Sequence, residues 1–356
     1  MQIIRLNVGY INGLILLLTL FCCFVGPIIS RTPYPLGVNL GPTYITAAYF
    51  TAEDQPVTVA RVKGTEVYRA YMTDTLENEG KRILRQGKWW VLEGESLVLA
   101  PPESHDSVKT KDLFVEALSS IKSAAETALG FQVSIGVISK PQQFNGTSTT
   151  CVIDAAMEVD TTLKRPDQIR PFVNTANLAY GPNSCVDLDF GNWSDYDDED
   201  KQITLLIDYS ADHIDIAVAD ITAWGVSRRG RWSQSLPERD EIRDSTARKY
   251  EGFKQALQEL IAGYLPTTPS FDYRAHFHAI ILSGEASSKA MSEIREAITS
   301  AIPNLQDKLQ DSIEPLYVGA VGAACWARQQ VLHPVLLQDV DLGTIIPDED
   351  ESHDEL

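Results

Sequence analysis

The chain has 356 residues, of which 44% are hydrophobic and 22% are charged, and its formal net charge is −19. This length predicts about two domains or one large two-lobed unit, and the composition is close to the globular average, so we expect a packed core. The strong negative charge argues against a nucleic-acid backbone or an anionic membrane surface as a partner.

An apolar run near the N-terminus predicts a secretory signal. The run spans Leu14–Ile29, it follows the basic residue Arg5, and Ser30 supplies a small residue before a cleavage point. Because the run is shorter than the roughly 20 residues that a membrane-spanning helix needs, cleavage is favoured over the alternative of an uncleaved anchor. We therefore expect residues 1–30 to be a signal peptide.

Residues 31–186 are predicted to form a first lobe. The stretch 37–50 has the pattern of a strand, a turn and a second strand, and 57–62 that of a third strand. An apolar face at helical spacing is formed by Phe114, Leu118, Ile121, Ala125 and Leu129. Residues 133–139 are predicted to form a buried strand, and a helix followed by a buried strand indicates a crossover unit.

Three cysteines lie outside the apolar N-terminal segment, at Cys151, Cys185 and Cys325. In an oxidising compartment one disulfide can form, with Cys151 and Cys185 as the nearest pair in sequence; three buried thiols are the alternative. Sequons begin at Asn145 and Asn192, and both agree with glycosylation in the secretory pathway.

The acidic segment 187–201 is expected to be a solvated linker between two lobes. Weak calcium binding is the alternative, although the ligand spacing and the glycine of a dedicated calcium loop are absent. A second lobe, 202–334, is predicted to follow. It begins with another strand, turn and strand at 205–218, and it ends with a small-residue helix at 317–330.

The last residues predict a cellular address. Residues 335–356 form an acidic tail that is poor in apolar side chains. The tail ends in His353, Asp354, Glu355 and Leu356, and a terminal H-D-E-L is bound by a retrieval receptor of the endoplasmic reticulum. Together with the predicted signal peptide, this motif predicts a protein of the endoplasmic-reticulum lumen.

The two predicted hairpins match each other. When 37–49 is set beside 206–218, Asn39 falls opposite Asp208 and Gly41 falls opposite Ser210. Turns of this kind can present consecutive backbone N–H groups to phosphate oxygens, and a carboxylate at a strand end can hold magnesium through its waters. An ordinary hairpin with an acidic turn is the alternative.

Six segments resemble, in the same order, segments of the nucleotide-binding domain of the seventy-kilodalton heat-shock chaperones, within the actin and hexokinase superfamily. "LGVNLGPTYITAAYF" and "LLIDYSADHIDIAV" resemble the two phosphate loops of that family. The others are "VSIGVISKPQQFN", "NTANLAYG", "AIILSGEASSKAMSEI" and "VGAVGAACWA". The resemblance spans residues 36–330 and implies an α/β fold: a duplicated, RNase H-like, actin-type two-lobed ATPase fold with trimmed peripheral subdomains.

The resemblance implies ATP and magnesium as cofactors, with Asp208 as the metal ligand. The implied binding residues are Asn39, Gly41, Thr43, Tyr44, Asp208, Ser210, Asp212, Gly284, Glu285 and Gly319. The family's catalytic lysine has no aligned counterpart among these segments, and Lys88 is the candidate for it.

Departures from the family pattern favour a degenerate site. Asn39 replaces the first-loop aspartate, and Ser210, Ala211 and Asp212 replace the second-loop glycines. A like-charge pair at about 4 Å and an effective dielectric of about 20 costs roughly 4 kcal/mol, so Asp212 would repel a phosphate. The chain also has no room for the family's adenine-clamping subdomain or for its peptide-binding domain.

Two functions follow from these patterns. The favoured one is a binding module of the lumen, linked to protein folding, that hydrolyses ATP weakly or not at all and binds a lumenal partner or client. The alternative is an active chaperone-like ATPase without a peptide-binding domain. A lumenal hydrolase or redox enzyme is disfavoured, because the sequence contains no G-x-S-x-G and no C-x-x-C motif.

Overall fold

A computed structural model of the protein describes residues 34–85, 107–163, 165–180, 202–210, 213–222, 225–235, 246–264 and 277–333. The chain divides into two units, Met1–Pro33 and Tyr34–Leu356, and all described residues belong to the second. The predicted signal peptide, acidic linker and C-terminal tail therefore lie outside the described residues. So do Lys88, Cys185, Asn192 and Asp212.

The described residues form a mixed α/β fold with two five-stranded sheets. The first sheet has the order β3-β2-β1-β4-β5. Its strands are β1 (Leu36–Leu40), β2 (Tyr44–Phe50), β3 (Pro56–Lys63), β4 (Ile135–Lys140) and β5 (Ile169–Pro171). β1, β2 and β3 pair in antiparallel fashion, whereas β4 is parallel to β1 and β5 is parallel to β4.

The second sheet repeats this topology with the order β8-β7-β6-β9-β10. Its strands are β6 (Gln202–Tyr209), β7 (His213–Thr222), β8 (Gly225–Ser235), β9 (Phe277–Ser283) and β10 (Leu309–Gln310). β6, β7 and β8 are antiparallel, and β9 and β10 continue the sheet in parallel from β6. Strand order and strand direction are therefore the same in both sheets.

Seven α-helices of the described residues cover the sheets. They are α2 (Glu66–Arg85), α3 (Ser107–Leu129), α4 (Gly146–Val159), α5 (Phe172–Tyr180), α6 (Thr246–Tyr264), α8 (Ser288–Ala301) and α9 (Val318–Leu332). Short 3-10 turns occur at η1 (Pro166–Gln168), η5 (Pro303–Lys308) and η6 (Pro315–Tyr317). None of the helices described here combines the length and the hydropathy that a membrane crossing requires.

Helix starts follow from local chemistry. The Asn145 side chain caps α4 by accepting a hydrogen bond from Ser148 N at 2.8 Å, and Ser287 caps α8 by accepting one from Ala290 N at 3.3 Å. Both caps satisfy N–H groups that lack a partner inside the helix. Pro303 opens the 3-10 turn that follows α8, where its missing N–H costs nothing.

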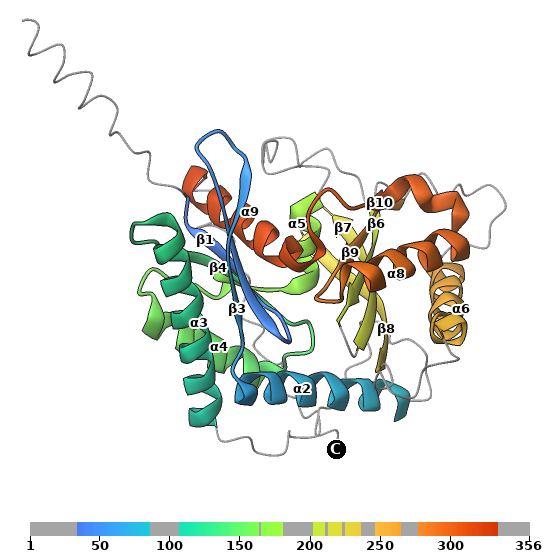
Figure 1. Cartoon of the computed structure of the whole chain (residues 1–356), viewed down its shortest axis with the longest axis horizontal. Helices are drawn as coiled ribbons and strands as arrows, with labels where there is room; N and C mark the ends of the chain where they lie inside the picture. The colour runs from blue at the N-terminus through green and yellow to red at the C-terminus, as the bar shows by residue number, and fades with distance from the viewer. Residues whose placement is uncertain are drawn as a thin grey trace, which may run out of the picture. The chain divides into compact units, whose positions relative to one another are not determined.

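The core is arranged in layers on both faces of each sheet. One face of the first sheet packs on α3 and α4, and the other face packs on α9. One face of the second sheet packs on α6 and α8, and the other on α5. α5 and α9 contact each other and lie between the two sheets in Figure 1. These two helices therefore connect the two sheets.

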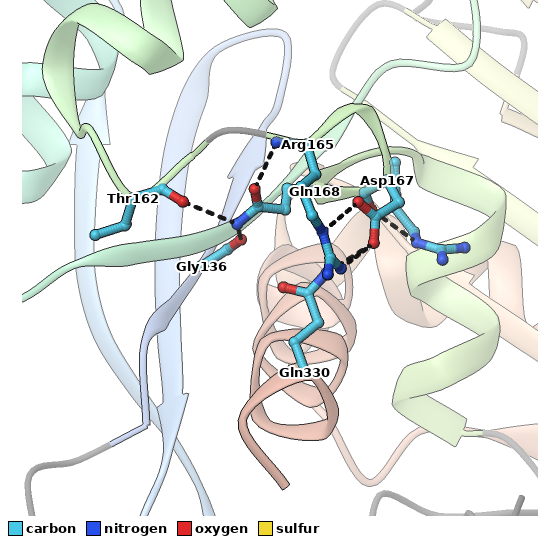
Figure 2. A network of polar contacts seen from close by, with 7 residues as sticks. Gly136, Thr162, Arg165, Asp167, Gln168 and Gln330 are labelled. Carbon is cyan, nitrogen blue, oxygen red and sulfur yellow. Dashed lines mark hydrogen bonds and ion pairs between the residues drawn. The ribbon is translucent and has the colours of Figure 1, made fainter. Parts of the chain in front are cut away.

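A polar network joins the β4–β5 connection to α9 (Figure 2). Gln168 donates from Nε2 to Gly136 O at 3.0 Å and accepts from Arg165 N at 2.9 Å. Asp167 forms an ion pair with Arg165 and accepts from Gln330 Nε2, in α9, at 3.1 Å. The network fixes the C-terminal part of α9 against the first sheet.

Most predicted elements are present in the two sheets and their helices, but α2, α4, β5, β8 and β10 were not predicted. Neither alternative for the cysteines holds: a Cys151–Cys185 disulfide is wrong, because Cys151 is a free, buried thiol on the inward face of α4, and the alternative of three free thiols is wrong, because Cys325 is bonded. Cys325 of α9 is disulfide-bonded, and its partner lies outside the described residues. Sequence proximity misled the pairing, because a disulfide depends on Cα separation in the fold.

Candidate functional site

A cavity of about 50 Å³ lies where the ends of β1 and β6 meet the loops that follow β4 and β9. Its lining includes six of the predicted site residues: Asn39, Gly41, Asp208, Ser210, Gly284 and Glu285. The fold therefore brings together residues that lie up to about 250 positions apart in sequence. Thr43, Tyr44 and Gly319 contact members of this group, whereas Asp212 lies outside the described residues.

The two hairpin turns beside the cavity are closed by the same bond. Gly41 N donates to Tyr44 O at 3.1 Å in the first turn, and Ser210 N donates to His213 O at 2.8 Å in the second. The preceding strand ends also match, since Asn39 is the neighbour of a serine on β4 and Asp208 is the neighbour of a serine on β9. The residue alignment drawn from the sequence is therefore the structural one.

The first turn is occupied by a carboxylate from the second sheet. Glu285 accepts from Thr43 N at 2.8 Å through Oε2 and at 3.1 Å through Oε1, and it accepts from Tyr44 N at 2.8 Å through Oε1. The N–H of Gly41 closes the turn, and Pro42 has no N–H. Each backbone donor of residues 41–44 thus already has a partner within the chain.

Glu285 is held in place by its two neighbours. Gly284 has φ of +117°, and a Cβ at this position would lie 2.2 Å from Tyr209 O. Its N–H donates to Pro315 O at 3.2 Å, while Ala286 N donates to Tyr209 O at 3.0 Å. The backbone on both sides of Glu285 is therefore anchored at the second sheet, and the side chain is directed to the first.

Gly41 and Tyr68 shape the first turn, where the Glu285 carboxylate binds. A Cβ at Gly41 would lie 2.3 Å from Glu285 Oε1, so only glycine leaves room for the carboxylate. Tyr68, a buried residue of α2, donates from its hydroxyl to Gly41 O at 2.9 Å. Burial raises the pKa of Tyr68 well above its usual value, and the charge of Glu285 raises it further, so the hydroxyl stays a proton donor.

A second bridge crosses the cavity in the opposite direction. Gln143, in the loop after β4, donates from Nε2 to Asp215 Oδ2 of β7 at 3.0 Å. Asp215 is buried, with 8% of its surface exposed. The loop after β4 therefore reaches the second hairpin, just as the loop after β9 reaches the first. Sequence reasoning missed Gln143, Asp215 and Tyr68, although the first two lie within segments that carried the resemblance.

The strand-end side chains of Asn39 and Asp208 pack against the protein itself. Asn39 is buried against the first turn of α9, where a Cβ at Gly319 would lie 2.4 Å from Asn39 Oδ1. Asp208 accepts from Ser283 Oγ at 3.3 Å through Oδ1. Among the residues that the structure describes, no group of three or more His, Cys, Asp or Glu side chains is placed to hold a metal ion.

The volume of the cavity limits what it can hold. Ligand pockets usually measure about 300–1,000 Å³. At about 50 Å³, this cavity is far below that range, so a nucleoside triphosphate does not fit in this arrangement. In this arrangement the site joins the two sheets through hydrogen bonds, and nucleotide entry requires Glu285 to leave the first turn.

Comparison with known proteins does not assign the chain to a family. No protein-family model matches the chain, and a search of curated proteins finds no match to it. The geometry of the site therefore carries the functional inference.

Proposed function

We propose that the chain is a non-hydrolysing relative of the two-lobed ATPases that serves as a protein-binding module in the lumen of the endoplasmic reticulum. In this proposal the fold is a duplicated, RNase H-like, actin-type fold with trimmed peripheral subdomains, similar to the nucleotide-binding domain of the seventy-kilodalton heat-shock chaperones. The module takes part in protein folding by binding a lumenal partner or client.

The repeated topology supports this assignment. Both sheets have the same strand order, and both hairpins that face the cavity have the same turn bond. Between β7 and β9 the described elements are only β8 and α6. The adenine-clamping subdomain that the resemblance implies for this position has no counterpart among them.

The main support for a loss of nucleotide binding is that Glu285 already occupies the first turn. A phosphate on the Thr43 and Tyr44 amides would have to displace Glu285, whose bonds to them are 2.8–3.1 Å long. Hydrogen bonds to a charged group contribute about 1.5–3 kcal/mol each. If Glu285 stayed close, a like-charge contact near 4 Å at an effective dielectric of about 20 would cost roughly 4 kcal/mol, or about three decades of affinity.

The lumenal location is proposed from the two ends of the sequence and from its sequons. A signal segment and a terminal H-D-E-L together direct a protein to this compartment, with the retrieval receptor as a further partner. At Asn145 the helix cap uses Oδ1, whereas a glycan is attached to the amide nitrogen. The cap is therefore compatible with glycosylation at this sequon.

Calorimetry with ATP and magnesium tests the proposal. We expect no binding heat for the folded wild-type protein at millimolar nucleotide, and the same null result for Asp208→Ala. Micromolar binding that Asp208→Ala abolishes would contradict the proposal. That outcome would favour the alternative, an active chaperone-like ATPase without a peptide-binding domain. The position of Asp208 at the cavity supports this alternative.

A further inference from the structure

The carboxylate of Glu285 takes the position of a ligand. Both of its oxygens accept backbone hydrogen bonds in a turn that belongs to the other sheet, 241 and 242 residues away in sequence. Consecutive N–H groups of a turn form an anion-binding concavity, so this turn is filled by an anion that the chain itself supplies.

The contact is built from both sides rather than formed by a flexible surface side chain. Gly41 leaves the space that the carboxylate fills, and Gly284 permits the close approach of the loop to Tyr209. The hydrogen bonds of Gly284 N and Ala286 N fix the backbone on either side of Glu285. Such preorganisation lowers the entropy that the side chain loses when it forms the contact.

A second contact repeats the arrangement with the roles of the sheets exchanged. Gln143 extends from the loop after β4 to Asp215 on the second sheet, while Glu285 extends from the loop after β9 to the first. The loops occupy equivalent positions in the repeated topology. The sheets are thus bridged at two points beside the cavity.

We propose that Glu285 and Gln143 form a two-point clasp that closes the two lobes on each other without any ligand, and that Glu285 inhibits anion binding at the Gly41–Tyr44 turn. The clasp rests on the proposed function, because it takes the place that a nucleotide would need. It makes closure of the lobes a property of the chain itself, with the surface of the closed form available to a partner.

Hydrogen–deuterium exchange with residue-level readout, performed on the full chain, tests the clasp. In Glu285→Ala the Thr43 and Tyr44 amides should exchange at least about tenfold faster than in the wild type, since a bond to a charged acceptor is lost. Glu285→Gln retains an uncharged acceptor of the same size and should give a smaller increase. Glu296→Ala, which removes an exposed glutamate of α8, is the matched control and should change neither amide.

The exchange rates of two other amides distinguish loss of the clasp from unfolding of the first hairpin. Gly41 N and Gly64 N bond to Tyr44 O and Thr43 O, and neither uses Glu285. They should keep their wild-type rates in Glu285→Ala. Equal acceleration of these amides would mean that Glu285 merely supports the fold of the first hairpin, and this result would overturn the proposal. Unchanged Thr43 and Tyr44 amides would overturn it as well.

Inorganic phosphate tests the inhibitory role. At millimolar concentration it should slow exchange of the Thr43 and Tyr44 amides in Glu285→Ala and leave the wild type unaffected. Protection in the wild type, or no protection in the variant, would overturn this role. Nucleotide titration of the wild type remains a separate test: binding there refutes the proposed function, whereas failure of the exchange experiment alone refutes only the clasp.

Discussion

Replacement of Gly284 tests how Glu285 is positioned. The change Gly284→Ala places a Cβ 2.2 Å from Tyr209 O and 2.6 Å from Tyr209 C and N, in a backbone with φ of +117°. The strain of such a conformation costs about 1–3 kcal/mol and overpacking against backbone about 1–3 kcal/mol, so the expected loss of unfolding free energy is about 2–6 kcal/mol. That is a large part of the roughly 5–15 kcal/mol that holds a domain folded.

Gly130 provides the matched control. It also has a positive φ, +77°, but a Cβ there would meet nothing within 4 Å. Gly130→Ala should therefore lower the unfolding free energy only by the cost of the left-handed backbone conformation, about 1–2 kcal/mol. Denaturant unfolding followed by tryptophan fluorescence measures both variants, since Trp232 and Trp326 are buried. An equal or smaller loss for Gly284→Ala would refute the close approach of the Glu285 loop to Tyr209.

Two further changes follow from the structure. Tyr68→Phe removes the hydrogen bond to Gly41 O and should lower the unfolding free energy by about 1 kcal/mol, measured by denaturant unfolding; an unchanged midpoint would contradict the bond. Burial alone would raise the pKa of Asp160, but hydrogen bonds from Ile135 N, Thr162 and Lys122 outweigh it and lower that pKa. The carboxylate therefore stabilises the fold fully above its unfolded pKa of about 3.9, and the stabilisation is lost as pH falls through the lower folded value. The difference in melting temperature between wild type and Asp160→Asn should accordingly shrink below about pH 4, and a constant difference down to pH 2 would contradict this assignment.

Local sequence patterns predicted the two hairpins. They did not predict the contacts between residues that are distant in sequence. Alternating apolar residues around a polar turn predicted the matching of Gly41 with Ser210, and both turns have the same bond. α2 was missed because only a few of its described side chains, such as Tyr68 and Met72, are buried, which gives a weak periodic signal. Tyr68 was therefore absent from the predicted site.

The sequence placed Glu285 among the implied binding residues without revealing what it contacts. Repulsion of a phosphate was predicted for Asp212, whereas in the fold it is Glu285 that accepts the hydrogen bonds of the Thr43 and Tyr44 amides. No sequence periodicity links residue 285 to residue 43, because their proximity depends on how the two sheets are placed by α5 and α9. Asp212, the residue first expected to exclude phosphate, lies outside the described part of the chain.

A crystal structure of the wild-type protein grown with magnesium and a non-hydrolysable ATP analogue would examine the occupied turn most directly. We predict Glu285 oxygens within hydrogen-bond distance of the Thr43 and Tyr44 nitrogens, with no phosphate density beside them. A γ-phosphate bound to those two nitrogens, with the Glu285 side chain turned away, would contradict the account.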